Sequence, residues 1–245
     1  MGRDMLTLYI AELIGVAAVT MLLGLSKRFK PLRILTFRYP KREAMVAFSL
    51  FVVTFIASLY FFRVPGIKIS YTTTTPEGIL PRLVLGGLCV LVCALALRLR
   101  KQPIRSAGWN RPQLMPGFQL GLALGFLTLF LGGKLTTLFK GIAADQVTML
   151  FYWLGIGLAE ESIFRGYIQL RLSAWLGKWA GIAATAVLST LWLLPLWLQL
   201  PGETALLQAG LTFSQALVVG WVAQRSNHVL GGAIYRAFSG WLMML

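Results

Sequence analysis

Eight apolar runs, separated by short basic stretches, constrain the fold of this chain more than any other feature. Most of them approach the roughly 17–25 residues that an α-helix needs to cross a bilayer. The sequence therefore predicts an all-α, polytopic transmembrane helical bundle of about eight spans. The runs cover approximately residues 5–25, 44–62, 83–97, 117–133, 147–170, 179–199, 204–224 and 228–245.

The composition supports a membrane location and excludes other classes. Of the 245 residues, 57% are hydrophobic and 13% are charged, and the mean hydropathy is +0.73. A soluble domain carries about a quarter charged residues. The net charge of +15 resides in loops between the apolar runs, which is typical of basic membrane loops rather than of a nucleic-acid groove. We therefore expect contact with a lipid bilayer and no nucleic-acid partner.

Basic residues are concentrated in alternate loops, and this pattern predicts the orientation. Loops rich in lysine and arginine stay in the cytoplasm. We therefore expect both termini to face outward and the odd-numbered loops to be cytoplasmic, as in a protein of the bacterial inner membrane. The richer loops contain Lys27, Arg28, Lys30, Arg33, Arg38, Lys41 and Arg42, then Arg98, Arg100, Lys101, Arg105 and Arg111, then Arg171 and Lys178, then Arg225; the others contain Arg63, Lys68, Arg82, Lys134 and Lys140.

The basic, proline-containing stretch 98–116 divides the chain into two predicted sections. Residues 1–116 would form an amino-terminal section of three spans, and residues 117–245 a core of five spans. The first run is expected to remain as a span, because no small-residue cleavage pattern follows it. Cys89 and Cys93 lie one helical turn apart in an apolar run, so we expect packing residues rather than a disulfide.

Three glycines, Gly117, Gly121 and Gly125, recur every four residues on one face of the fourth run. Such a stripe of small residues lets a second helix approach closely. The partner helix belongs either to the same chain or to a second copy, and packing within the chain is the favoured interpretation.

Two adjacent carboxylates, Glu160 and Glu161, lie inside the fifth run, with Arg165 one turn later. Charges inside a bilayer cost about 2.5–3.5 kcal/mol each on insertion scales, so the motif is a candidate functional site. In a helix, Glu161 and Arg165 can form an ion pair, whereas Glu160 points about 100° away. An unpaired carboxylate in an apolar pocket can act as a general base for water. The alternative is an ion pair that ties helices together.

The motif and its surroundings resemble the CPBP family of intramembrane endopeptidases, which includes CAAX-protease, bacteriocin-processing and Abi-type proteins. The likeness covers roughly residues 147–245. The resemblance implies a helical membrane fold in which glutamates and histidines bind and activate water, with or without a metal ion. The matching positions are Glu160, Glu161 and Phe164-Arg165-Gly166-Tyr167, then Leu170-Arg171, Trp179-Ala180-Gly181-Ile182, Leu188-Ser189-Thr190-Leu191-Trp192, Gly220-Trp221, Arg225 and Gly232-Ala233-Ile234.

The two histidine motifs of the family are degenerate in this chain. The second, an aromatic residue followed four residues later by histidine, falls on Trp192 and Leu196. The third, a histidine followed four residues later by asparagine, falls on Arg236 and Gly240. Leucine offers no lone pair, and arginine remains charged. The single histidine, His228, precedes the last run, and we expect a loop or interfacial residue rather than a ligand.

These departures predict that the retained motif is structural. If Arg236 faces the same pocket, it would complete a neutral quartet with Glu160, Glu161 and Arg165, in which a paired glutamate is a weak base. Alternatively, the last helix is rotated and the Arg236 guanidinium snorkels to the interface. Two carboxylates alone cannot supply the ligands of a metal site. We therefore expect no metal and no cofactor.

Three functions remain open on the sequence alone. The favoured one is a non-catalytic pseudoprotease that serves as scaffold, assembly or regulatory subunit for another integral membrane protein. Eight tryptophans and fifteen phenylalanines supply aromatic surface for such protein–protein interaction. The main alternative is an active, glutamate-dependent intramembrane endopeptidase. A transporter is the third, although no inverted repeat or pair of broken helices accompanies the intramembrane charges.

Overall fold

A computed structural model of the chain describes residues 3–26, 37–61, 76–198 and 200–242. In these ranges the regular structure is entirely helical, which confirms the all-α prediction. The predicted loop residues Lys27, Arg28, Lys30, Arg33, Arg63 and Lys68 lie outside the described ranges. The elements are α1 (Arg3–Gly24), α2 (Pro40–Phe61), α3 (Pro76–Leu99), η2 (Ile104–Ala107), η3 (Arg111–Gln113), α4 (Leu114–Leu131), α5 (Leu135–Lys140), α6 (Ala144–Glu161), η4 (Ser162–Ile168), α7 (Gln169–Leu176), α8 (Lys178–Trp192), α9 (Leu194–Trp197), α10 (Gly202–Ser226) and α11 (Leu230–Leu242).

Six helices of the described residues are long and apolar enough to cross a membrane, which confirms a polytopic bundle. They are α1, α2, α3, α4, α10 and the continuous unit of α6, η4 and α7. The predicted spans at 179–199 and 228–245 correspond to α8 followed by α9, and to α11. Helix α8 has 15 residues and is separated from α9 by a turn, and the described part of α11 extends to Leu242. The prediction of about eight spans is therefore consistent with the structure as an approximate number.

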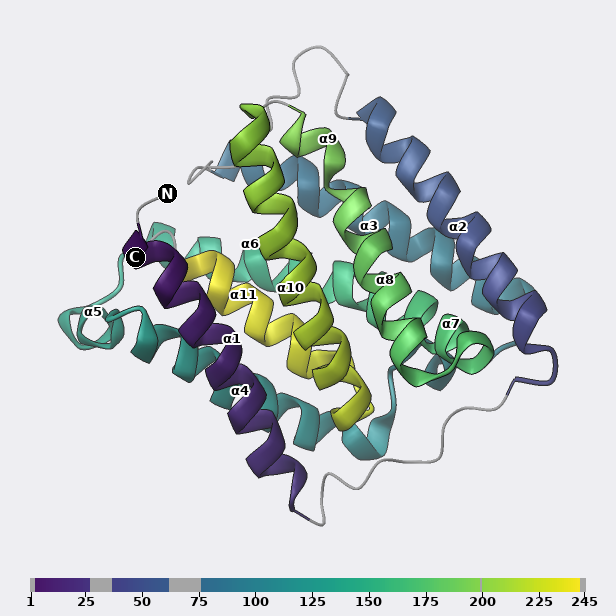
Figure 1. Ribbon diagram of the computed structural model, residues 1–245, viewed down its shortest axis with the longest axis horizontal. Helices are drawn as coiled ribbons and strands as arrows, with labels where there is room; N and C mark the ends of the chain where they lie inside the picture. Colours follow the sequence, from purple (N-terminus) through teal and green to yellow (C-terminus); the bar gives the residue numbers. More distant parts are fainter. Residues whose placement is uncertain (1–2, 27–36, 62–75, 199, 243–245) are drawn as a thin grey trace.

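The short helix α11 lies inside the bundle (Figure 1), where it packs most extensively against α4 and α6 and also contacts α10. On one side, α1 covers α4 and α10. On the other, α3 packs on α6, α2 packs on α7, and α8 packs on α7 and α10. The acidic motif at the end of α6 is therefore surrounded by helices from both halves of the sequence.

The glycine stripe of α4 packs against α11 of the same chain. A Cβ atom added to Gly117, Gly121 or Gly125 would lie 3.1, 2.7 or 2.6 Å from an α11-side residue, closer than ordinary van der Waals contact. Only glycine allows this separation of the two helix backbones. The residues that the three glycines face are, in order, His228, Ile234 and Phe238.

The stretch between the two predicted sections is a packed connection. Its Gly108 has a left-handed backbone, with φ +76°, and its carbonyl oxygen accepts a hydrogen bond from Val229 N at 3.2 Å. A Cβ at Gly108 would lie 3.0 Å from Cα of Gly166 in η4. The connection thus packs on both the motif segment and the turn before α11, and it joins the two sections at the site.

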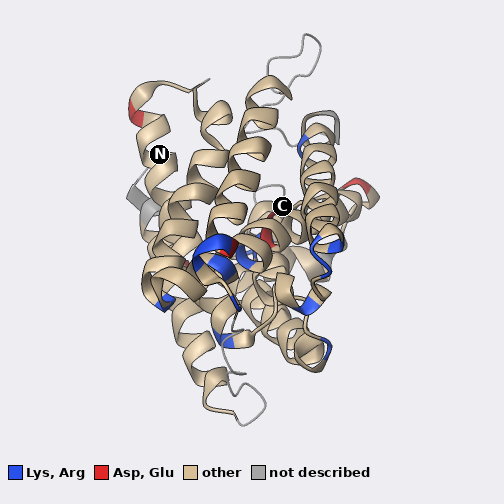
Figure 2. Cartoon of the chain, turned by 90° about the vertical axis from the view of Figure 1, so that its right-hand side faces the viewer, with Lys and Arg blue, Asp and Glu red and all other residues tan. Residues whose placement is uncertain are grey.

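Large apolar side chains cover the outer faces of the helices. Leu22, Leu91, Phe130 and Phe151 are all about two-thirds exposed, a degree of exposure that suits hydrocarbon rather than water. Most of the surface ribbon in Figure 2 belongs to uncharged residues, and most of the blue lysine and arginine segments lie in the lower half of that view. Cys89 and Cys93 are buried and free, as expected of packing residues.

Candidate functional site

The acidic pair lies where an α-helix passes into a π-helix. Glu160 and Glu161 end α6, and the chain continues without a break through the π-helical segment η4 into α7. Such π-helical segments are rare and frequently occur at functional sites. Within η4, Gly166 permits close approach of η2, because a Cβ there would overlap the carbonyl oxygen of Ala107. The motif is thus held between the connecting stretch and the centre of the bundle.

Both oxygens of Glu160 are occupied by guanidinium groups from other helices. Arg82 of α3 places Nε 2.8 Å and Nη2 2.7 Å from Oε1 of Glu160. Arg236 of α11 places Nη2 2.6 Å from Oε2. Glu160 is only 2% exposed, so these charge-assisted contacts replace its hydration.

Glu161 is completely buried and has weaker contacts. Arg236 Nη1 donates to Oε1 of Glu161 at 3.2 Å. Arg165 Nε lies 3.5 Å from Oε2, which is the i, i+4 ion pair expected from the sequence. The Oε2 atom has no hydrogen-bond partner, and Arg165 Nη2 donates instead to the carbonyl oxygen of Ala216 at 3.0 Å.

The prediction of a neutral quartet is wrong, because the site contains one further arginine, Arg82. The sequence predicts Arg82 in a loop before the third run, whereas α3 begins at Pro76 and includes it. Packing of α3 on α6 brings Arg82 to Glu160, and Leu83 fits against Gly155, where a Cβ would lie 2.7 Å away. The site therefore contains three guanidinium groups and two carboxylates. The polar first turns of α3 gave no hydropathy signal for this role.

Two of the degenerate motif positions lie in an apolar core. The Trp192 ring meets the Phe164 ring edge-on, with centroids 5.8 Å apart, and is 1% exposed. Leu196 belongs to α9, which is separated from α8 by a turn at Leu193. Trp192 and Leu196 belong to the same buried apolar cluster.

Gly240, the last motif position, serves helix packing. A Cβ atom there would lie 2.5 Å from the Trp153 ring of α6. Arg236 is one turn earlier on α11, so the close approach at Gly240 helps to set the depth at which its guanidinium reaches the acidic pair.

His228 lies in the turn between α10 and α11, but it is buried rather than interfacial. Its Nδ1 accepts a hydrogen bond from Leu230 N at 3.0 Å, and its ring meets the Trp109 ring edge-on at 5.4 Å. Burial lowers the pKa of His228. The ring therefore acts as a neutral cap for the first turn of α11.

A second buried ion cluster, absent from the sequence interpretation, joins α2 to α7. Arg100 forms two hydrogen bonds to Glu43, at 2.6 and 2.9 Å, and Arg171 Nε lies 3.3 Å from the same carboxylate. Gln102 donates to Glu43 and accepts from Arg171. Arg171, predicted in a cytoplasmic loop, lies in α7 and stacks 3.6 Å from the centroid of the Tyr167 ring.

A third buried carboxylate, Glu12 of α1, is held by hydroxyl groups. Thr128 donates to Glu12 Oε1 at 3.2 Å, and Tyr235 and Ser239 also hydrogen-bond to it. Gln215 donates to the hydroxyls of Tyr235 and Ser239 at 3.5 and 3.4 Å. This polar group links α1, α4, α10 and α11, and the sequence interpretation missed it.

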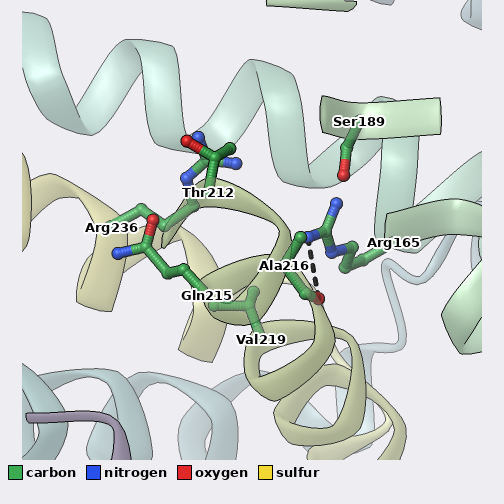
Figure 3. Close-up of a pocket in the computed structure, with 7 residues that line it drawn as sticks. All are labelled: Arg165, Ser189, Thr212, Gln215, Ala216, Val219 and Arg236. Atoms are coloured by element: carbon green, nitrogen blue, oxygen red, sulfur yellow. Dashed lines mark hydrogen bonds between the residues drawn. The ribbon is translucent and has the colours of Figure 1, made fainter. Parts of the chain in front are cut away.

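A small cavity lies beside the arginines of the site, between α8, α10 and α11 (Figure 3). Its volume is about 10 Å³, roughly enough for one water molecule. The acidic pair is not part of its lining. The residues that line it are Arg165, Ser189, Thr212, Gln215, Ala216, Val219 and Arg236.

The side chains present do not fit a divalent metal. Both motif carboxylates are engaged by guanidinium groups, and three positive charges would repel a cation. Among the described residues, no three His, Cys, Asp or Glu side chains are grouped closely enough to hold a metal ion.

Residues 143–242 match the model of a protein family described as type II CAAX prenyl endopeptidase Rce1-like. The match begins just before α6 and ends with α11, so it includes the acidic pair, Arg165, the cavity and Arg236. Neither the search of curated proteins nor that of solved structures found a match.

Proposed function

We propose that this membrane protein, whose residues 143–242 form a CAAX-endopeptidase-like domain of the CPBP family, is non-catalytic. It serves as a scaffold, assembly or regulatory subunit for another integral membrane protein. The observation that carries this proposal is that both glutamates are engaged in ion pairs. Glu160 pairs with Arg82 and Arg236, and Glu161 pairs with Arg236 and Arg165.

The arrangement disfavours water activation. A general base needs a free lone pair within reach of a water molecule. Oε1 of Glu160 accepts a hydrogen bond from Arg82, Oε2 forms an ion pair with Arg236, and Arg236 lies where the family's third motif has histidine. A cavity of about 10 Å³ does not admit a peptide bond beside a water nucleophile.

One observation favours the alternative of an active glutamate-dependent endopeptidase. Oε2 of Glu161 has no hydrogen-bond partner. If a conformational change opened the site, that oxygen would be the base, and Glu161→Gln would abolish cleavage while leaving the fold intact.

The two functions are separated by a cleavage assay and a copurification. Purified full-length protein would be incubated with farnesylated CAAX peptides and with unprenylated peptides, and products measured by mass spectrometry. The proposal expects no cleavage above that of Glu161→Gln. Cleavage by the wild type alone would overturn it.

The copurification tests whether a partner protein binds the chain at a constant ratio in native membranes. The chain, tagged at its normal expression level, would be purified in mild detergent. The proposal expects one membrane protein at a constant ratio. As a matched control, Lys101→Cys, an exposed change remote from the cavity, should retain that ratio. Recovery of the chain alone, in several detergents, would count against a subunit role.

We further propose the orientation in which both termini face outward and the basic loops face the cytoplasm of a bacterial inner membrane. The gathering of basic residues toward one end supports it (Figure 2). Labelling with a membrane-impermeant maleimide tests it, since Cys89 and Cys93 are buried. Ala143→Cys should label from outside, and Lys101→Cys only after permeabilisation.

A further inference from the structure

The arginine cluster carries an excess positive charge. Arg82, Arg165 and Arg236 form their ion pairs with Glu160 and Glu161. Three guanidinium groups against two carboxylates leave a net charge of +1. All five groups lie within the bundle, where an uncompensated charge is expensive. A negative partner from outside the chain would restore neutrality.

The other carboxylates of the described residues do not supply that charge. Glu12 is the buried carboxylate on the Tyr235 side of α11. The groups that act on Glu12 are the hydroxyls of Thr128, Tyr235 and Ser239, with no arginine among them. Glu43 is engaged by Arg100 and Arg171 at the other end of α7.

Arg165 has donors that nothing in the described structure accepts. Its Nη1 and Nε are buried and have no hydrogen-bond partner, although Nε lies 3.5 Å from Glu161. A buried donor without a partner costs about 1–3 kcal/mol, and more when the group is charged. Arg165 also lines the cavity, with its guanidinium below Ser189 in Figure 3. The guanidinium group of Arg165, which has donors without a hydrogen-bond partner, therefore borders the cavity.

The remaining lining adds a second cation and a neutral donor. Arg236 and Thr212 lie on the opposite side of the cavity from Arg165 in Figure 3. The Ser189 hydroxyl donates to the Ala186 carbonyl at 3.0 Å, so its hydrogen is already used. The polar groups that border the cavity are thus two guanidinium groups, the hydroxyls of Thr212 and Ser189 and the Gln215 carboxamide, with no carboxylate in its lining.

We propose that this cavity binds one small monovalent anion of the size of chloride. Arg165 Nη1, the Arg236 guanidinium and the Thr212 hydroxyl are its donors. The volume of about 10 Å³ is close to the minimum for one water molecule, so among anions only a single-atom ion such as a halide approaches that size. The anion neutralises the cluster and satisfies Arg165. It is a structural ligand that stabilises the positions of α8, α10 and α11, and it is independent of the proposed scaffold role.

Halide-dependent stability tests the proposal. Purified full-length protein would be unfolded thermally at constant ionic strength while sodium gluconate is replaced by chloride or bromide. A ligand of the folded state raises the midpoint in a saturable way, by about 2–4 °C once it exceeds several times its dissociation constant. A flat series would mean that water fills the cavity and would overturn the proposal.

Two substitutions assign the response to this cavity. Thr212→Val removes one donor at nearly constant volume and should shift the response to higher halide concentration. Thr148→Val, on the exposed face of α6, is the matched control and should behave as the wild type. An equal response in all three proteins would indicate a general salt effect and would contradict the assignment.

Bromide also allows direct location on the wild-type protein, without reliance on any variant's folding. Crystals grown in bromide should give an anomalous peak beside Arg165 Nη1. A site elsewhere would overturn the proposal. So would stabilisation of delipidated protein by phosphatidylglycerol, but not by bromide, since that outcome identifies a lipid head group as the anion.

Discussion

Arg236 contacts both motif glutamates at once, with Nη2 2.6 Å from Glu160 Oε2 and Nη1 3.2 Å from Glu161 Oε1. A histidine at this position would leave one of these oxygens free, because an imidazole cannot present two parallel donors to two carboxylates. The arginine at this position makes the acidic pair part of an ion network. That network joins α3, α6 and α11.

Loss of Arg236 should therefore destabilise the fold strongly. Arg236→Ala leaves Glu161 without its closest cation, and removal of one partner from a buried ion pair costs about 3–5 kcal/mol. Thermal or denaturant unfolding in detergent would measure the loss. Arg105→Gln, an exposed change in η2, serves as the control. Wild-type stability in Arg236→Ala would mean that the contact is not maintained in the membrane.

Arg82→Gln should cost less than Arg236→Ala. The change removes hydrogen bonds to Glu160, worth about 1.5–3 kcal/mol for a charged acceptor, but Arg236 still holds the other oxygen. It also removes the excess positive charge. The same unfolding assay gives the order of the two variants, and the reverse order would show that Arg82, not Arg236, is the principal cation of the site.

The close packing of α4 on α11 predicts opposite effects for two glycine substitutions. Gly125→Ala would place a Cβ 2.6 Å from the Phe238 ring and should destabilise the protein by about 1–3 kcal/mol. Gly210→Ala on α10 meets nothing within 4 Å and should stabilise by about 0.5–1 kcal/mol, because alanine favours the helix. Unfolding of both variants under one condition tests the pair.

The buried His228 predicts a loss of stability in mild acid. Because burial lowers its pKa below the ordinary 6.5, the unfolded chain binds the proton more tightly than the folded one. Stability is then fully present above pH 6.5 and falls as the pH drops below that value. His228 is the single histidine of the chain, so His228→Asn should remove the slope. An unchanged slope in that variant would assign it to other groups.

The sequence was informative where charge interrupts a long apolar run. Glu160, Glu161 and Arg236 could be identified for that reason, and the family resemblance supplied their relation. Arg82 and Glu43 lie in the first turns of helices, where a basic or acidic residue cannot be told from a loop residue by hydropathy. Glu12 is a single carboxylate in an apolar run, and its hydroxyl partners come from helices far apart in sequence.

The number of spans is only approximately predictable from the sequence, for a related reason. Hydropathy continues across the turn at Leu193 and up to the turn at His228, because the residues there are buried in protein. An apolar run therefore predicts burial but cannot distinguish a lipid-crossing helix from a shorter one packed among its neighbours.

The central position of α11 couples two parts of the structure. This helix contacts α4, α6 and α10, its Arg236 binds the acidic pair, and its Tyr235 hydrogen-bonds to Glu12 of α1. Any displacement of α11 would therefore change the surroundings of both groups of buried carboxylates together.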